Sequence, residues 1–339
     1  MKEHVVRVLI TGICGQDGPY LVDEVRKEWP HAIIFGFFRG QDEARLADMR
    51  ALLPEVEWLR GDIADPASVS AAVIKSQPML VFNLAAMSYV PLSWTAPQHY
   101  IEVNAKGVLN LLEAIRQHYP EAHMVQASTS EMFGNGNGRT ALNELSPMAP
   151  ASPYGVSKLA AHHLCLVYRE SYGLHVSSAI SFNHESPRRP IQFVTRKVTH
   201  AVARIVSGLQ DTLEMGNLNA FRDWGYAGDF MEAYVKMAQA PEPDDYVVGT
   251  GETHSIVALL DAAFAAAGVA GGEWGRYVTS TPEHMRPRDV KHLRADPSKI
   301  LSKLGWEPKV TFRELIKMMV EHDLEEVRNC LSVASSSIR

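Results

Sequence analysis

The sequence predicts an α/β fold, in which a doubly wound parallel sheet carries a smaller mixed α/β lobe at its C-terminal side. Three observations support this. In the first half of the 339 residues, short β-branched runs alternate with longer amphipathic stretches. A glycine-rich turn joins the first of these runs to the first amphipathic stretch. Beyond about residue 185, the alternation gives way to mixed loop and helix.

The elements of the first half follow one another regularly. Runs rich in Val, Ile, Leu and Phe predict strands over residues 5–12, 31–38, 55–62, 79–86 and 122–130. Apolar residues three to four apart predict helices over residues 17–29, 66–77, 96–119 and 154–173. Strands that alternate with helices pair in parallel through right-handed crossovers, and ligands bind at the carboxyl ends of such strands.

Composition excludes several classes of protein. A hydrophobic content of 46% with 21% charged residues is ordinary for a globular enzyme. The net charge of -6, without blocks of like charge, argues against nucleic-acid or membrane-surface partners. We expect a cytoplasmic protein, because no leader-like segment or apolar run of transmembrane length is found. Cys14, Cys165 and Cys330 lack CxxC spacing, so neither a disulfide framework nor a metal site is expected.

A GxxGxxG pattern formed by Gly12, Gly15 and Gly18 follows the first strand and opens a helix. Small residues there permit a tight turn and let backbone N–H groups approach a pyrophosphate at the positive end of the helix. This context favours a Rossmann-type dinucleotide site over a plain strand-to-helix turn. Arg39 stands where an NAD-preferring protein places an acidic residue, which favours NADP; a solvated surface arginine is the alternative. Asp62 is either an adenine contact or a turn residue.

Tyr154 and Lys158 form a YxxxK pair on a predicted helix. Residues four apart share a helix face, so both side chains are expected to point into one cleft. A free tyrosine, with a pKa of ~10, is a poor base at neutral pH, and an adjacent cation favours its phenolate. Lys158 is also placed to donate hydrogen bonds to the nicotinamide ribose.

Together, GxxGxxG, STSE at residues 128–131 and YxxxK resemble the extended short-chain dehydrogenase/reductase superfamily. Longer segments sharpen the resemblance, in order from near residue 8 to near residue 324: FNLAAMSYV, ASTSEMFG, SPYGVSKLAA, FNHESPRRPIQFVTRK and RDWG. They are similar to the corresponding segments of GDP-mannose 4,6-dehydratases, and FNHESPRR with FVTRK and RDWG is much more specific than the superfamily motifs.

The resemblance implies a hydro-lyase that converts GDP-D-mannose to GDP-4-keto-6-deoxy-D-mannose and water through tightly bound, recycled NADP. It implies that Tyr154, aided by Thr129, removes the 4-hydroxyl proton as NADP takes the C4 hydride. Glu131 then abstracts the C5 proton and returns a proton to the water that leaves C6. Related epimerases and simple reductases need no base at C5, so Glu131 favours dehydration.

The resemblance also implies the ligand contacts. The expected cofactor contacts are Gly12, Gly15, Gln16, Asp17, Gly18, Arg39, Asp62, Ile63, Leu84, Ala85, Ala86, Tyr154 and Lys158. The expected substrate contacts are Ser88, Asn183, Val194, Lys197, Arg222, Arg286 and Asp289, with Arg188, Arg189 and Arg196 as nearby candidates. His184 is assigned no role, because a lone histidine beside an asparagine is more often a satisfied loop residue.

Residues 1–182 are expected to form mainly the NADP-binding domain. Residues 183–330 are expected to form mainly a nucleotide-sugar-binding lobe, with some segments returning to the first domain, and residues 331–339 a tail. The arginine-rich loop through which many family members tetramerise is shortened here after the second strand. We therefore expect a homodimer through helices near residues 98–118 and 154–171, with a tetramer as the alternative.

Two further departures leave alternatives open. Met87 and Tyr89 replace a more usual polar pattern, QSHV, in the expected sugar pocket. Residues 286–289 read RPRD where the family commonly has RPxE. The enzyme alternatives are a dehydratase of another GDP-sugar, such as a heptose, and a GDP-4-keto-6-deoxy-sugar reductase or epimerase. The alternative from a different class is a non-catalytic NADP-binding regulatory protein, because a fold alone does not imply activity.

Overall fold

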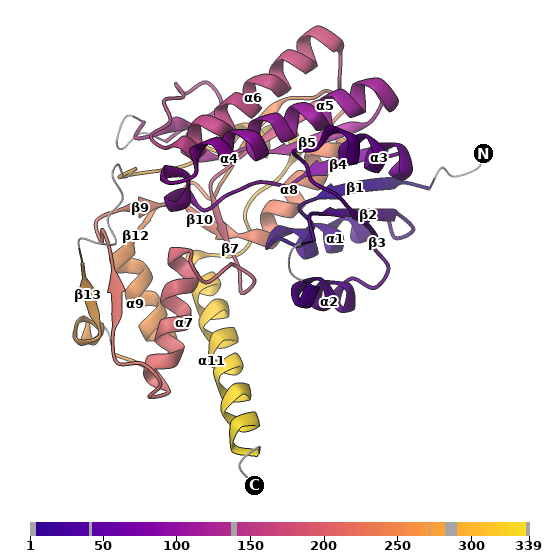
Figure 1. The fold of residues 1–339 in the computed structure, drawn as a ribbon. Helices are drawn as coiled ribbons and strands as arrows, with labels where there is room; N and C mark the ends of the chain where they lie inside the picture. Colours follow the sequence, from indigo (N-terminus) through magenta and orange to yellow (C-terminus); the bar gives the residue numbers. More distant parts are fainter. Residues whose placement is uncertain (1–4, 41–42, 137–140, 271, 282–289, 337–339) are drawn as a thin grey trace.

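A seven-stranded parallel sheet forms the centre of the computed structural model, which describes residues 5–40, 43–136, 141–270, 272–281 and 290–336 (Figure 1). The strand order is β11-β6-β5-β4-β1-β2-β3. The bounds are β1 (Arg7–Thr11), β2 (Ile33–Phe38), β3 (Glu57–Arg60), β4 (Leu80–Asn83), β5 (His123–Ala127), β6 (Val176–Ser181) and β11 (Asp245–Val248). The predicted fold class is confirmed, and the order reverses between β1 and β4, where such sheets bind ligands.

Helices cover both faces of this sheet. One layer contains α3 (Pro66–Ser76), α4 (Pro97–Ile101), α5 (Gly107–His118) and α6 (Pro153–Tyr172), and the other contains α1 (Asp17–Glu28), α2 (Glu43–Leu52) and α8 (Ala227–Gln239) (Figure 1). Because side chains alternate along a strand, Val8 and Ile10 pack in the core below the sheet and Leu9 in the core above it.

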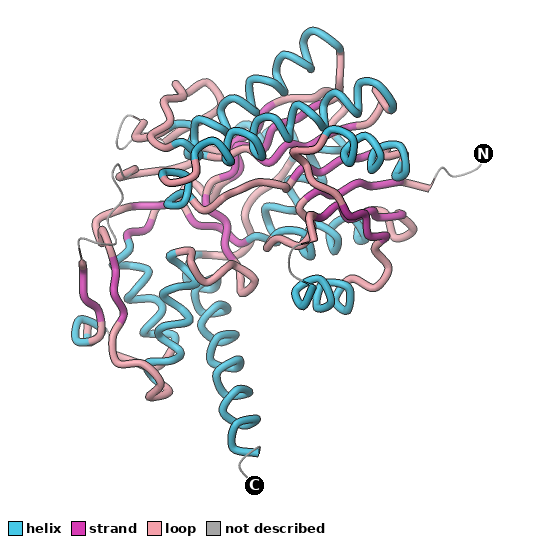
Figure 2. The backbone as a smooth tube through the Cα atoms, viewed as in Figure 1, coloured by secondary structure: helices cyan, strands magenta, loops and turns pink. Residues whose placement is uncertain are grey.

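The second lobe has its own apolar core, built by α7 (Val194–Val206), α9 (Ile256–Ala266) and α11 (Phe312–Ser336). Figure 2 shows these helices on one side of the sheet layers, with α11 extending away from them. Short strand pairs surround the helices: β7 (Asn183–Glu185) with β10 (Trp224–Tyr226), β9 (Phe221–Arg222) with β12 (His254–Ser255), and β8 (Leu213–Met215) with β13 (Val278–Ser280).

Between these strands the chain returns to the sheet. Strand β11 adds to its edge beside β6, and α10 (Ser298–Leu304) packs against β11. The assignment of residues 1–182 and 183–330 to two functional domains stays a prediction.

Three local differences from the predicted elements bear on the site. The helix expected over 96–119 is divided, because a π-helical segment at Glu102–Lys106 separates α4 from α5. The shortened loop was expected over residues 38–49, but its second part lies in a helix, α2 (Glu43–Leu52). The strand expected over 122–130 ends at Ala127, because Thr129 caps a 3₁₀ turn over Ser130–Phe133 by accepting the Glu131 N–H.

Within the described ranges, no helix is both long and apolar enough to cross a bilayer. The same residues contain no group of three or more His, Cys, Asp or Glu side chains placed to hold a metal ion.

Candidate functional site

A cavity of about 1170 Å³ opens at the carboxyl edge of the sheet, between the strand ends and the second lobe. Many of the predicted site residues line it, although they lie far apart in sequence. They are Gly12, Gly15, Gln16, Asp17, Arg39, Leu84, Ala86, Ser88, Thr129, Glu131, Tyr154, Lys158, Asn183, Val194, Lys197 and Arg222. Gly18, Asp62, Ile63 and Ala85 are not among the lining residues. Arg286 and Asp289 lie outside the described residues.

The glycine turn is shaped by close backbone approach. Gly12 has a φ of +68°, and a Cβ there would lie 2.7 Å from the backbone of Ala85, at the end of β4. A Cβ on Gly18 would lie 1.8 Å from the Ile13 carbonyl oxygen. No side chain is tolerated at either position, so the first turn of α1 can present its N–H groups to the cavity. Gly18 and Ala85 thus shape the cavity without lining it.

Arginines gather at the end of the cavity next to β2. Arg39 and Gly40 follow that strand, and Arg45 reaches in from α2, where its guanidinium donates to the Cys14 carbonyl at 2.6 Å. Sequence reasoning missed Arg45, because α2 was not expected as a helix.

Asp62, expected as either an adenine contact or a turn residue, accepts the Ala64 N–H at 2.9 Å in a local turn. Its contact with adenine stays a prediction.

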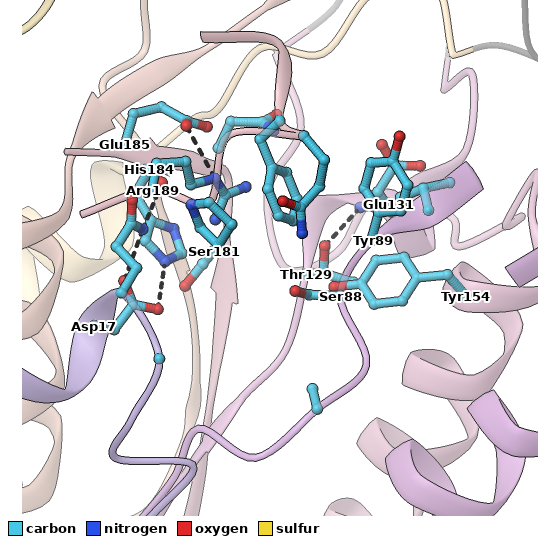
Figure 3. Close-up of a pocket in the computed structure, with 18 of the residues that line it drawn as sticks. Asp17, Ser88, Tyr89, Thr129, Glu131, Tyr154, Ser181, His184, Glu185 and Arg189 are labelled. Carbon is cyan, nitrogen blue, oxygen red and sulfur yellow. Dashed lines mark hydrogen bonds and ion pairs between the residues drawn. The ribbon is translucent and has the colours of Figure 1, made fainter. Parts of the chain in front are cut away.

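Helix α6 brings Tyr154 and Lys158 into the cavity. Ser152 caps the helix by accepting the Gly155 N–H at 3.1 Å, and Pro153 occupies the first turn, where a missing N–H costs nothing. The Lys158 ammonium donates to the Ala127 carbonyl at 2.7 Å, at the end of β5. Figure 3 shows Tyr154 with Thr129, Ser88 and Glu131 on one side of the pocket.

The expected effect of Lys158 on Tyr154 is not what the structure shows. Burial, with a smaller contribution from the Glu131 charge, raises the pKa of Tyr154 to about 12, although hydrogen bonding with Thr129 and the charge of Arg189 oppose this. Burial also lowers the pKa of Lys158 to about 8. The Lys158 ammonium bonds the Ala127 carbonyl and the Tyr154 pKa is raised, so the expectation of a lowered Tyr154 pKa was wrong.

A buried chain of side-chain hydrogen bonds ends at the Ala127 carbonyl, which also accepts the Lys158 hydrogen bond. The Thr11 hydroxyl bonds to Asn83 Oδ1, Asn83 Nδ2 donates to Gln126 Oε1 at 2.7 Å, and Gln126 Nε2 donates to the Ala127 carbonyl at 2.8 Å. The chain crosses the ends of β1, β4 and β5. It fixes the carbonyl that Lys158 also bonds.

Glu131 lies in the 3₁₀ turn after β5 and is 9% exposed. Within the described part of the chain, no side chain makes a hydrogen bond or ion pair with its carboxylate, which lines the cavity. A buried carboxylate without a partner costs free energy, and such groups concentrate at functional sites. The geometry therefore presents Glu131 as an acid/base group facing the same cavity as Tyr154.

The second lobe contributes cations and an amide to the opposite wall. Asn183 begins β7, Lys197 lies in the first turn of α7, and Arg222 ends β9. Burial lowers the pKa of Lys197, with the Glu214 charge opposing it. Arg196, a nearby candidate, points elsewhere: its guanidinium bonds Asp323 and Glu326 of α11, each at 2.7 Å.

Two cavity residues were missed or undervalued in the sequence. His184, assigned no role, lines the cavity with Nε2 3.1 Å from Asp17 Oδ2. Arg189 lines it too, stacked 3.7 Å over the Phe193 ring and 3.0 Å from a Glu185 carboxylate oxygen. Figure 3 shows this group across the pocket from Tyr154. The Asp17 partner of His184 is 167 residues away, so no local pattern could reveal it.

Comparisons with known proteins identify relatives of this chain. The family described as GDP-mannose 4,6 dehydratase matches residues 9–319. GDP-mannose 4,6 dehydratase 1 of Arabidopsis thaliana is 41% identical over 329 residues, which cover 94% of this chain and 89% of the plant protein. The Drosophila melanogaster GDP-mannose 4,6 dehydratase is 39% identical over 342 residues, which cover 94% of this chain and 86% of the fly protein. Among solved structures, the Thermus thermophilus UDP-glucose 4-epimerase in complex with NAD superposes with a TM-score of 0.82 at 32% identity and covers 94% and 99%.

Proposed function

This chain belongs to the GDP-mannose 4,6-dehydratase family, and we propose that it is a hydro-lyase that converts GDP-mannose to GDP-4-keto-6-deoxy-mannose and water with a recycled NADP. The observation that carries the proposal is Glu131, a buried carboxylate that lines the same cavity as Thr129, Tyr154 and Lys158. A reductase or epimerase that acts only at C4 does not need a second acid/base group at C5, whereas dehydration across C5 and C6 needs one.

The residues divide the proton chemistry between them. The phenolate form of Tyr154, hydrogen bonded with Thr129, takes the proton of the sugar 4-hydroxyl. Oxidation at C4 acidifies the C5 proton, which the Glu131 carboxylate removes. Glu131 then returns this proton to the hydroxyl that leaves C6 as water, and C5 takes up a solvent proton when C6 receives the hydride. A bound nicotinamide cofactor supplies the acceptor, and later the donor, of the hydride, so no net oxidation results.

Two features of this cavity fit a phosphorylated dinucleotide. The glycine turn provides a side-chain-free approach to helix α1. Arg39, which follows β2, and Arg45, on α2, both line the cavity and supply the positive charge that a 2′-phosphate would need. The proposed cofactor is therefore NADP, held through the turn, the arginines and the backbone after β4. Lys158 would contact the nicotinamide ribose.

The substrate side also fits a nucleoside diphosphate sugar. In a chain whose net charge is -6, Lys197 and Arg222 place positive charge at one wall of the cavity. Asn183 and Ser88 add hydrogen-bonding groups, and Val194 adds an apolar contact. Tyr89, which lines the cavity, is the feature that favours a second candidate substrate, another GDP-sugar; Met87, expected in the same pocket, packs against the apolar core instead.

We also propose a cytoplasmic homodimer. Cys14, Cys165 and Cys330 are free thiols, which suits a reducing compartment. The outer surfaces of α4 and α6 expose Ile101, Val156 and Val167. Burying them between two copies would remove apolar surface from water.

The test is incubation with GDP-mannose and catalytic NADP without added reductant. Dehydration yields the 4-keto-6-deoxy product and no lasting change in nicotinamide absorbance. A reductase would require stoichiometric NADPH, and a regulatory protein would yield no product. A panel of GDP-, dTDP- and UDP-sugars distinguishes GDP-mannose from a second GDP-sugar. No product from any member would refute the proposal.

A further inference from the structure

Side chains of the glycine turn contact the second lobe directly. Gln16 Nε2 donates to the His184 carbonyl at 3.1 Å, and the Ser186 hydroxyl donates to Gln16 Oε1 at 3.1 Å. Asp17 Oδ2 lies 3.1 Å from His184 Nε2. These contacts join residues 167 to 170 positions apart in the chain. They tie the start of α1 to β7 and the residue that follows it.

The histidine of this group is held in one orientation. His184 Nδ1 lies 3.0 Å from the Phe182 carbonyl, and its ring stacks on Phe230 with centroids 4.8 Å apart. In the imidazolium both ring N–H groups therefore have acceptors. The pair is largely buried, with side-chain exposures of 15% for His184 and 23% for Asp17. Burial strengthens the attraction between opposite charges and leaves little room for rearrangement.

Gln16 is fully engaged by the same group. Besides bonding His184 and Ser186, its amide donates to Asp17 Oδ1 at 2.9 Å. Both amide hydrogens and the carbonyl oxygen thus have protein partners. Gln16 and Asp17 were expected only as cofactor contacts, but their side chains bond residues of the second lobe.

We propose that Gln16, Asp17, His184 and Ser186 form an interlobe latch that makes cofactor binding and GDP-sugar binding mutually dependent. One end of the latch is the turn that receives the cofactor. The other end is the segment that begins with the substrate candidate Asn183 and continues to Arg189. A ligand that orders one end lowers the cost of ordering the other, and such coupling acts equally in both directions. The choice of nucleotides rests on the proposed function.

The latch residues are positioning residues, because they act through the two segments they join. Their effect extends toward the reaction centre: Arg189, four residues beyond β7's last residue, contributes charge at both Asp17 and Tyr154. Displacement of residues 183–189 would therefore change the electrostatic effect of Arg189 on Asp17 and Tyr154. The expected signature of a broken latch is lost coupling between ligands in a folded protein.

The test measures GDP binding by calorimetry with and without saturating NADP. Variants are Asp17→Asn, His184→Gln and the double variant. The control is Asp245→Asn on the outer strand β11, which breaks an ion pair of 2.6 Å with Arg169. This pair is also largely buried, with side-chain exposures of 14% for Asp245 and 15% for Arg169. Circular dichroism and thermal melts confirm that each variant is folded.

We expect wild type and Asp245→Asn to bind GDP about tenfold more tightly when NADP is present, within the usual range of coupling. In Asp17→Asn and His184→Gln the ratio should fall below about twofold, and the double variant should be no worse than either single one. In turnover, the KM for GDP-mannose should rise more than kcat falls.

A wild-type ratio of one, or an unchanged ratio in folded Asp17→Asn and His184→Gln, would overturn the latch. Wild-type turnover of GDP-mannose alongside that result would leave the proposed function intact. If the wild type made no product from GDP-mannose yet showed the expected ratios, the function would fail and the latch would stand.

Discussion

Two ionisable side chains, Glu131 and Lys158, are buried in the wall of the cavity near Tyr154. Burying ionisable groups lowers the free energy of unfolding. Lys158 is 4% exposed, and burial lowers its pKa to about 8. Its ammonium donates a hydrogen bond to a neutral carbonyl, that of Ala127. Groups placed this way are retained for what they do with a ligand rather than for stability. The two side chains therefore make separate predictions.

Glu131→Gln should lose water elimination while its fold and nucleotide binding persist. A positioned acid/base group is worth about 10² to 10⁴ in rate, so turnover should fall by that factor. Incorporation of deuterium at C5 from D₂O, followed by NMR, reports the proton transfer directly, and Glu131→Gln should lose it. Glu242→Gln, an exposed change, is the control. Turnover near the wild-type rate in Glu131→Gln would remove this residue from the mechanism.

Lys158→Met should abolish turnover without lowering the melting temperature at neutral pH. The pKa of Lys158 falls from 10.5 to about 8 on folding, so the folded chain binds fewer protons than the unfolded chain between these values. The penalty for burying the charge is full below about pH 8 and disappears as pH rises toward 10.5. Thermal melts of both proteins across this range test the sign. A variant that melts well below wild type at neutral pH, with the gap persisting at high pH, would contradict it.

At the scale of elements, the π-helical segment between α4 and α5 explains how the loop after β4 is held. Its Asn104, 1% exposed, accepts the Met87 N–H at 2.8 Å and donates to the Met87 carbonyl at 3.0 Å. It also donates to the Ser157 hydroxyl at 2.9 Å. One side chain therefore fixes a cavity loop to α6. Such segments often mark functional sites.

Asn104→Ala should destabilise the protein and weaken substrate binding together. It leaves both backbone groups of Met87 without their partner, and each such loss costs about 1–3 kcal/mol. Denaturant unfolding measures the stability, and the KM for GDP-mannose should rise because the loop carries Ser88 and Tyr89. Gln117→Ala, an exposed change on α5, should shift stability by less than about 0.5 kcal/mol. Equal stability in the two variants would show that Asn104 does not hold the loop.

At the scale of the whole molecule, the sequence predicts what depends on local pattern. Alternating runs predict the sheet, and glycine spacing predicts the turn where Gly12 meets β4. Helical spacing places Tyr154 and Lys158 on one face. What it cannot predict depends on distant partners: the Asp17–His184 pair, the direction of the Lys158 ammonium, and the burial that raises the pKa of Tyr154. Asn104 likewise bonds Met87 and Ser157, which lie 17 and 53 positions away in the chain.

Coupling between the lobes should depend on pH. Burial opposes the charge of His184, but Asp17 outweighs it and raises the His184 pKa above 6.5; the Arg189 charge opposes this more weakly. Burial likewise opposes the charge of Asp17, yet His184 outweighs it and holds the Asp17 pKa below 3.8. Both partners are therefore mainly charged between pH 3.8 and pH 6.5, and the ion pair is lost as pH rises through the raised His184 pKa.

The ratio of GDP affinities with and without NADP should therefore decline in wild type as pH rises above 6.5 and through the raised His184 pKa. In His184→Gln the ratio should stay low and flat, which separates the latch from titration of the ligand phosphates. A wild-type ratio that rises with pH would assign the coupling to another group.

The most direct test of the central claim, that one cavity performs an internal redox dehydration, is turnover of GDP-mannose deuterated at C4. Mass spectrometry and NMR of the product locate the label. If Tyr154 and Glu131 act on the same sugar as proposed, the deuterium reappears at C6 and remains there without added reductant. A product with deuterium retained at C4, or with none at C6, would contradict the proposed reaction.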